Sequence, residues 1–249
     1  MDTEKISSID SPAGPIACVA CGRGWIVVEK PCGLSIHNEP GIDLCSVIQA
    51  ALERGWLPAF GNNRHAVHAV HRLDRDTSGV VLLATGPETL AWFGRQFSAR
   101  TVSKRYLAVV HGRIDEPSPG NDWHEWRWRL TAVAGGRKDP MGRGRRAPCT
   151  TRWRALDFSS HFALIECEPL TGRKHQIRRH AKLAGHPVVG DRRYGSNRSL
   201  EHLIREYRFD RLGLHAHELG VHLPGGSRAT LFRSAGLPQA MQQLLRADA

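Results

Sequence analysis

An unbroken apolar run, GVVLLAT at 79–85, follows directly on a charged stretch, HRLDRDTS at 71–78. A short run of aliphatic residues of this kind is typical of a buried strand. The stretch before it contains two arginines and two carboxylates, Arg72, Asp74, Arg75 and Asp76. The fold must therefore bury the strand and still accommodate four charges where it begins. A solvated loop without a function would meet that requirement too, so other features have to decide.

The chain is long enough and apolar enough to form a stable core without cross-links. It has 249 residues, of which 41% are hydrophobic, and a domain of that size buries roughly 70% of its unfolded surface. Lys and Arg total 35 against 24 Asp and Glu, which gives a formal net charge of +11. An excess of that size favours a polyanionic partner such as a nucleic acid.

The cysteines and the N-terminus indicate a reducing compartment. Six cysteines are sparse and irregularly spaced, at positions 18, 21, 32, 45, 149 and 167, which argues against a disulfide scaffold. Residues 1–24 lack the apolar segment of a signal peptide, and the chain contains no apolar run as long as a membrane helix. We expect a soluble, cytoplasmic protein without a membrane partner.

Periodicity and turn residues predict the other elements. Residues 1 to 23 are expected to be a loose or partly extended lead-in. Asp43 is expected to cap a helix that ends near Gly55. Further helices are expected within 86–100, 171–185 and 238–249. Further strands are expected at 25–29, 104–112, 126–130, 149–156, 161–170, 211–226 and 229–234.

A glycine-rich connection in the middle of the chain carries much of the positive charge. The segment GGRKDPMGRGRRAP includes Arg137, Lys138, Arg143, Arg145 and Arg146. Few loops of this composition pack against a protein core. We therefore expect the loop at 137–146 to contact phosphate groups.

Two other kinds of site have weaker support. His65, His68 and His71 recur every three residues and Cys18 and Cys21 form a CxxC. An extended segment would point His65 and His68 to opposite sides, and no second ligand pair stands at zinc-finger spacing, so we expect no metal site.

A serine hydrolase is no better supported. No Gly-x-Ser-x-Gly elbow occurs, and Ser78 lies where a turn residue is expected anyway. Asp74 therefore remains the strongest candidate. Because arginines flank it, we expect its carboxylate to stay ionised and to act as an acceptor or nucleophile.

The charged stretch resembles the signature of the RluA-type family of RNA pseudouridine synthases, in which His-Arg-Leu-Asp carries the catalytic aspartate. The other family motifs follow in the right order. They are VVEKPCGLSIH at 27–37, KRYLAVVHG at 104–112, TGRKHQIRRH at 171–180, AGHPVVGDRRYG at 184–195 and RLGLHAHEL at 211–219. The resemblance covers about residues 25 to 235.

The resemblance implies an isomerase that breaks the bond between uracil N1 and ribose C1′, turns the base and rejoins it through C5. It implies no cofactor and no metal. Asp74 would be the nucleophile or the carboxylate that stabilises the sugar cation. Arg178 would pair with Asp74, and Tyr106 would stack on the uracil and move a proton.

Several basic residues are candidates for RNA contacts. Arg72 would occupy the space left by the target base, because an enzyme acting on a stacked nucleotide must extrude it. Lys30, Arg173 and Lys174 are expected to contact phosphates. Arg75 and Asp76 are expected to shape the turn. The sequence departs from the usual family pattern at Glu29, Asn38, Lys174 and Arg179, where Asn, Pro, Thr or Ser, and Val are more typical.

The implied fold is α+β, with a long mixed, mostly antiparallel sheet, flanking helices and a central cleft. We expect a single catalytic domain at 25–249, with no S4-type domain in residues 1–24, and a monomer that binds ribosomal or transfer RNA. The sequence leaves open which uridine is modified and whether an adduct forms at the sugar or the base. A catalytically inert RNA-binding protein of the same fold and a zinc-dependent hydrolase are the alternative hypotheses.

Overall fold

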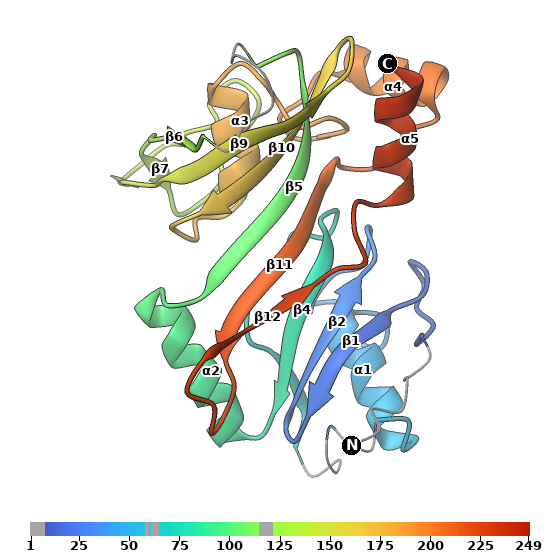
Figure 1. The fold of residues 1–249 in the computed structure, drawn as a ribbon, viewed down its shortest axis with the longest axis vertical. Coiled ribbons are helices and arrows are strands. Elements are labelled where there is room, and N and C mark those ends of the chain that lie inside the picture. The colour runs from blue at the N-terminus through green and yellow to red at the C-terminus, as the bar shows by residue number, and fades with distance from the viewer. Residues whose placement is uncertain (1–7, 58–59, 61–64, 115–121) are drawn as a thin grey trace. The chain divides into compact units, whose positions relative to one another are not determined.

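The computed structural model describes residues 8–57, 60, 65–114 and 122–249 (Figure 1). The chain forms two compact units, and the single catalytic domain expected at 25–249 stays a prediction. Unit 1 comprises Met1–Lys104 and Ala216–Gly236, and unit 2 comprises Arg105–His215 and Leu237–Ala249. Both units contain helices and strands, and each of the described pairs with a stated register is antiparallel.

Unit 1 is built on a sheet in which β1, β2, β4 and β11 lie in that order, with β3 beside β4 and β12 beside β11. The strands are β1 (Ala17–Gly22), β2 (Trp25–Lys30), β3 (Val67–Ala69), β4 (Ser78–Thr85), β11 (Leu214–His222) and β12 (Ala229–Arg233). Strand β1 shows that part of the lead-in, which was expected to be loose or partly extended, is an extended strand of this sheet.

Strand β4 confirms the prediction made from the apolar run. All eight of its residues are buried. At its start, Gly79 has a φ of +116°, and a Cβ atom at this position would lie 2.1 Å from the carbonyl oxygen of Ala216 in β11. Any side chain there would collide with the backbone of the neighbouring strand. Gly79 thus lets the backbone of β4 approach β11 closely at the point where the charged stretch ends.

Two helices belong to unit 1, α1 (Leu44–Glu53) and α2 (Pro87–Ala99). The side chain of Asp43 accepts a hydrogen bond from the N–H of Ser46 at 2.9 Å, which confirms the predicted N-cap. Helix α1 ends before Gly55, which has a φ of +73°. Pro87 occupies the first turn of α2, inside the range 86–100 in which a helix was expected.

Unit 2 contains a second group of strands, in the order β5, β10, β9 and β6. These are β5 (Ser103–His111), β10 (Phe162–Pro169), β9 (Thr151–Phe158) and β6 (His124–Trp126); β7 (Leu130–Thr131) and β8 (Arg146–Ala147) form a separate pair. Three helices complete the unit, α3 (Gln176–Leu183), α4 (Asn197–Tyr207) and α5 (Gln239–Ala247).

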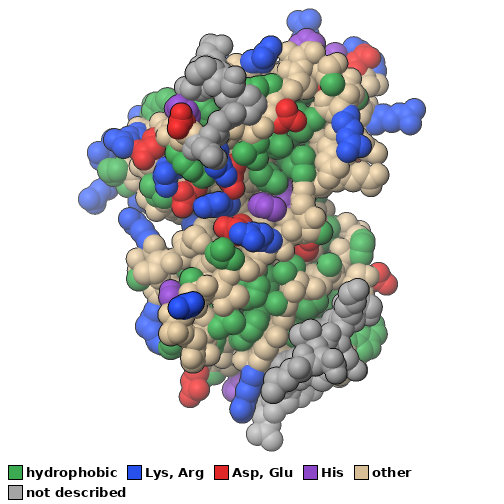
Figure 2. Space-filling view, viewed as in Figure 1, with side chains coloured by type: hydrophobic (Ala, Val, Ile, Leu, Met, Phe, Trp, Pro, Cys, Tyr) green, Lys and Arg blue, Asp and Glu red, His purple; other side chains and the backbone are tan. Residues whose placement is uncertain are grey.

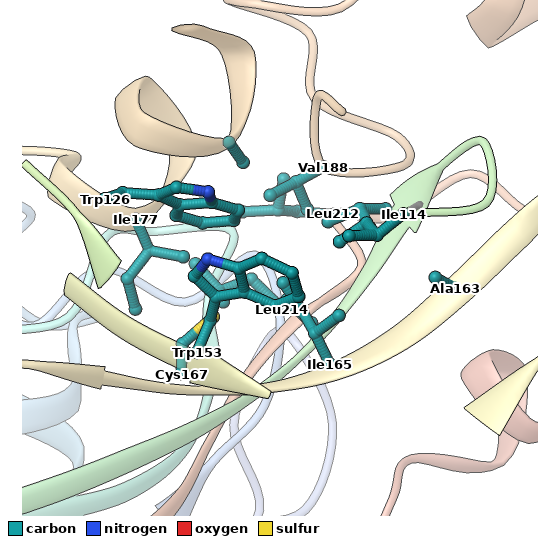
Figure 3. Close-up of a cluster of buried hydrophobic side chains, with 13 residues drawn as sticks. Ile114, Trp126, Trp153, Ala163, Ile165, Cys167, Ile177, Val188, Leu212 and Leu214 are labelled. Atoms are coloured by element: carbon teal, nitrogen blue, oxygen red, sulfur yellow. The ribbon is translucent and has the colours of Figure 1, made fainter. Parts of the chain in front are cut away.

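The core of unit 2 lies between α3 and the face of the sheet that carries Trp153 (Figure 3). The indole rings of Trp126 and Trp153 stack with their centroids 5.4 Å apart. Ile177 from α3 and Ile165 from β10 belong to the same buried cluster. Period-two alternation in the strands and the apolar stripe of α3 are thus both explained by one core.

Two predictions for unit 2 need correction. Residues 126–130 do not form one strand, because β6 ends at Trp126 and β7 begins at Leu130. The burial in this segment still alternates, since Arg127 and Arg129 are exposed and Trp126 is buried. Helix α4 was missed by the sequence analysis, although Leu200, Leu203, Ile204 and Tyr207 recur at helical spacing; of its residues only Leu203 is buried. None of the helices that the structure describes is long and apolar enough to cross a lipid bilayer.

Candidate active site

Asp74 lies in the loop that connects β3 to β4. The N–H of Thr77 donates to the carbonyl oxygen of Asp74 at 3.1 Å, which closes a turn just before the strand begins. Thr77 and Ser78 are buried, whereas Asp74 is half-buried. The loop therefore holds the carboxylate at the boundary between the core of unit 1 and its surface.

The turn is fastened to the segment that follows β2. The carbonyl oxygen of Arg75 accepts from the N–H of Gly33 at 3.0 Å, and the Arg75 guanidinium donates back to the carbonyl oxygen of Gly33 at 2.9 Å. The Cys32 thiol donates to the carbonyl oxygen of Asp76 at 3.0 Å. The sequence analysis expected Arg75 and Asp76 to shape the turn, and these bonds show how their backbone does so.

Lys30 makes the central contacts between the segment after β2 and this turn. The prediction that it contacts RNA phosphate is wrong. Its side chain is fully buried. The ammonium donates to the carbonyl oxygens of Pro31, Leu34 and Arg75 at 2.9, 2.7 and 2.9 Å. A lysine ammonium has three N–H donors. The three carbonyl oxygens accept hydrogen bonds from the donors that a phosphate would need. Lys30 instead joins the segment after β2 to the turn that carries Asp74.

His71 anchors the other end of the same loop. Its Nε2 atom accepts a hydrogen bond from the N–H of Leu82 at 3.0 Å, and its ring stacks on Phe97 with centroids 5.0 Å apart. Burial, with a smaller contribution from Lys104, lowers the pKa of His71 to about 3. The ring is therefore neutral and structural, a role that the sequence analysis did not foresee.

Arg72 lies between His71 and Asp74 and differs from both in its exposure. Its side chain is exposed. Among the described residues it makes no side-chain hydrogen bond or ion pair that would fix it. That position agrees with a group that meets a substrate, and its entry into the space of a displaced base stays a prediction.

In unit 2, the predicted catalytic guanidinium is held by a residue that the sequence analysis did not name. Arg178, on α3, is 6% exposed. Its Nε and Nη2 atoms donate to the two carboxylate oxygens of Asp191 at 2.7 and 2.9 Å. The guanidinium carbon also lies 5.3 Å from the centroid of the Tyr194 ring. A bidentate pair and an aromatic face together fix the orientation of the guanidinium plane.

Asp191 is itself positioned by the turn that follows it. Its Oδ1 atom accepts from the backbone N–H groups of Arg193 and Tyr194 at 2.9 and 3.0 Å. Burial alone would raise the pKa of Asp191, but the hydrogen bonds and charge of Arg178, with the two N–H groups, outweigh burial and lower it. The only sequence signal for this role was the GDRRYG motif itself.

Tyr106 lies on β5, opposite Cys167 in β10. It is half-buried and packs against the same cluster that contains Ile177 of α3. Tyr106 and Arg178 therefore belong to one unit and to one side of its sheet. Asp74 belongs to unit 1, and its pairing with Arg178 stays a prediction.

Comparisons with known proteins bear directly on these residues. A sequence model of the RNA pseudouridylate synthase family matches residues 24–183, a range that contains Asp74, Tyr106 and Arg178. This chain belongs to the RNA pseudouridylate synthase family. Its relatives place it with the RluA-type members, which are isomerases that act on RNA.

Several curated relatives of the pseudouridylate synthase family are similar over most of the chain. An uncharacterized RNA pseudouridine synthase from Chloroflexus aurantiacus is 37% identical over 88% of this chain and 65% of that protein. Ribosomal large subunit pseudouridine synthase D from Zymomonas mobilis is 32% identical over 93% of this chain and 72% of its own length. The chain thus spans about two thirds of the length of these relatives.

Solved structures agree on the pseudouridylate synthase fold. Human RNA Pseudouridylate Synthase Domain Containing 4 has a TM-score of 0.70 at 23% identity, covering 92% of each chain. Human RNA Pseudouridylate Synthase Domain Containing 1 has a TM-score of 0.66 at 22% identity and covers 99% of this chain and 97% of its own. The α+β fold class predicted from the sequence is confirmed.

The remaining predicted RNA contacts lie in the turn before α3. Gln176 organises that turn, because its Oε1 atom accepts from the N–H of Arg173 at 3.0 Å and from the hydroxyl of Thr171 at 2.7 Å. Arg173 is half-buried and Lys174 is exposed. Their phosphate contacts stay predictions. Within the described part of the chain, no group of three or more His, Cys, Asp or Glu side chains is arranged to hold a metal ion.

Proposed function

We propose that this chain converts uridine to pseudouridine in ribosomal RNA, with Asp74 as the catalytic carboxylate. The observation that carries the proposal is the loop of the HRLDRDTSG motif, which is tied at both ends and keeps Asp74 at the surface of unit 1. The curated relatives from Zymomonas mobilis and Vibrio cholerae are named as ribosomal large subunit synthases, which favours ribosomal over transfer RNA.

The reaction balances without any other reactant. The bond from uracil N1 to ribose C1′ breaks, the base turns, and a bond from C5 to C1′ forms. The proton leaves C5 and N1 gains one. Asp74 would act at C1′ or on the base as nucleophile, or would stabilise the cationic sugar as a carboxylate does in glycoside chemistry.

Arg178 and Tyr106 have supporting roles in this proposal. Asp191 occupies the Nε–Nη2 edge of the Arg178 guanidinium, and a guanidinium has further N–H donors on its other edges. We propose that such an edge receives the Asp74 carboxylate and keeps it ionised and aimed. Tyr106 would stack on the extruded uracil, and its hydroxyl would carry the proton from C5. Arg72 would fill the space that the base leaves.

Two matched variants in one loop test the assignment. Asp74→Ala should slow pseudouridine formation by about 10⁴-fold or more, the scale on which removal of an essential group slows other enzymes. Asp76→Ala is the control, since Asp76 lies two residues away and its backbone carbonyl makes the turn contact. That variant should retain most of the activity. Pseudouridines are mapped in unmodified large-subunit ribosomal RNA with and without each protein.

Three results would contradict the proposal. Activity that survives in Asp74→Ala would remove the catalytic assignment. Tight RNA binding by the unaltered protein without any change in uridine would support the inert RNA-binding alternative. Activity that is lost to a metal chelator would support the zinc-dependent hydrolase instead.

A further inference from the structure

Arg179, the neighbour of Arg178 on α3, is fully buried, although it carries a charge. Its guanidinium makes five hydrogen bonds of 2.5–3.2 Å. Two of them end on Thr131 in β7, two end on the segment between β7 and β8, and one ends on the carbonyl oxygen of Lys174. The acceptors on Thr131 are its carbonyl oxygen and its hydroxyl, and those in the segment are the carbonyl oxygens of Pro140 and Met141.

We name residues 132–145, between β7 and β8, the basic loop. All five acceptors of Arg179 are neutral oxygens, so no carboxylate compensates its charge through a hydrogen bond. A buried charge without hydrogen-bonded partners is strongly unfavourable. If the basic loop moved away, Arg179 would lose two of its five acceptors, the carbonyl oxygens of Pro140 and Met141. The loop conformation and the burial of Arg179 therefore stabilise each other.

A second arginine holds the basic loop from the other side. Arg193 donates to the carbonyl oxygens of Ala134 and Gly135 at 2.9 and 2.8 Å. Its own N–H binds Asp191, the partner of Arg178. The loop is also folded tightly on itself, since a Cβ atom at Gly142 would lie 2.1 Å from the hydroxyl of Thr131. The prediction that this glycine-rich loop does not pack is wrong.

The packed loop displays cations on its outer side. Lys138, Arg143 and Arg145 are exposed, and no ion pair with another described residue neutralises them. The one acidic residue of the loop, Asp139, lies 3.8 Å from Arg146. Figure 2 shows several Lys and Arg side chains on the side of unit 2 where Figure 1 draws β6 and β7. Charge of this kind on a fixed loop is suited to RNA phosphates.

We propose that Arg179 is a positioning residue that keeps the basic loop in a preformed shape for RNA phosphates. This inference rests on the proposed function and deepens it. Arg179 follows Arg178 on α3, and Arg193 follows Asp191 by two residues. Both anchors of the loop are thus continuous with the pair that orients the predicted catalytic guanidinium. The RNA backbone held by Lys138, Arg143 and Arg145 is thereby fixed relative to Arg178.

A pair of variants and their combination test the inference. The first is Arg179→Val, which introduces the residue more typical of the family. The second is Lys138→Gln/Arg143→Gln/Arg145→Gln, which removes the displayed charge and leaves the anchor in place. A control, Arg95→Gln/Arg205→Gln/Arg228→Gln, removes the same charge at exposed positions elsewhere. Binding of unmodified large-subunit ribosomal RNA is measured from low to high salt, and KM and kcat are measured separately.

We expect the triple loop variant to lower the slope of log affinity against log salt by about two to three, because each lost phosphate contact contributes about 0.9. We expect KM to rise about tenfold or more with kcat nearly unchanged. Arg179→Val should likewise lower the slope of log affinity against log salt and raise KM, with kcat nearly unchanged. Adding Arg179→Val to the triple variant should then change KM very little, because the loop has no charge left to position.

A purely structural role for Arg179 would give a different pattern. Arg179→Val would then raise KM by the same factor in the triple variant as in the unaltered protein. This outcome overturns the inference. An unchanged salt slope in the triple variant overturns it as well, even if Arg179→Val does not fold. An equal loss in the control variant also overturns it, since net charge would then explain the binding. RNA binding with the expected slopes but without pseudouridine would refute the proposed function and leave this inference standing.

Discussion

Replacing Asp191 by Asn tests whether the bidentate pair orients Arg178. The side chains of Arg178 and Asp191 are 7% and 0% exposed, and they share two hydrogen bonds of 2.7 and 2.9 Å. Breaking a buried pair on one side costs about 3–5 kcal/mol, because the other charge stays buried without its partner. Since a domain is stabilised by only about 5–15 kcal/mol, the variant should lose about a fifth or more of its free energy of unfolding.

Urea unfolding followed by tryptophan fluorescence measures this loss. With m values of about 1–3 kcal/mol per molar urea, the midpoint should fall by about 1 M or more. Asp210→Asn is the control, because Asp210 is an exposed aspartate of the same unit, and exposed substitutions usually change stability by no more than about 0.5 kcal/mol. If both variants unfold at the same urea concentration, the pair does not hold Arg178 as described.

The same pair has a defined pH dependence. The pKa of Asp191 is lower in the folded protein than its usual value, through Arg178 and two N–H groups acting against burial. Its contribution to stability is therefore complete above the usual aspartate range and is lost as pH falls through the lowered pKa. The difference in stability between the unaltered protein and Asp191→Asn should stay constant above about pH 5 and shrink in acid. A difference that grew in acid would refute the assignment.

Two further substitutions test the parts that position Asp74. Gly79→Ala places a Cβ atom 2.1 Å from the carbonyl oxygen of Ala216 at a φ of +116°, so it should lower the free energy of unfolding by about 2 kcal/mol or more; a thermal midpoint within 2 °C of the unaltered protein would contradict this reasoning. Lys30→Met removes three hydrogen bonds to carbonyl oxygens and should reduce kcat while leaving the salt dependence of RNA binding unchanged, because Lys30 is buried; a smaller salt slope would show that Lys30 contacts phosphate.

Local patterns explain what the sequence could predict. The helix at 44–53 has an aspartate cap and an apolar stripe, and β4 has an unbroken apolar run, so neighbours in the chain suffice to define both. Asp74, Arg178 and Tyr106 came from motifs of a known family. The match of that family's sequence model to residues 24–183 supports the identification, while the roles of the three residues remain to be tested.

Tertiary contacts explain what the sequence could not predict. Lys30 was expected at the surface, as most lysines are, but three carbonyl oxygens from two loops surround its ammonium. The basic loop was expected to be unpacked because its anchor, Arg179, lies about 40 residues further along the chain. Asp191 stood in a recognised motif, yet its partner is 13 residues away on a helix. Each of these contacts depends on where the fold brings distant residues together.

The buried cations change how the net charge of +11 should be interpreted. Lys30, Arg178 and Arg179 are each less than one tenth exposed. Lys30 fixes the turn of Asp74, Arg179 fixes the basic loop, and Arg178 is the predicted partner of Asp74. Their N–H donors bind protein oxygens, so they release no counterions when RNA binds. Because the salt slope counts only cations that meet phosphate, we expect it to follow the exposed cations of the basic loop rather than the total charge.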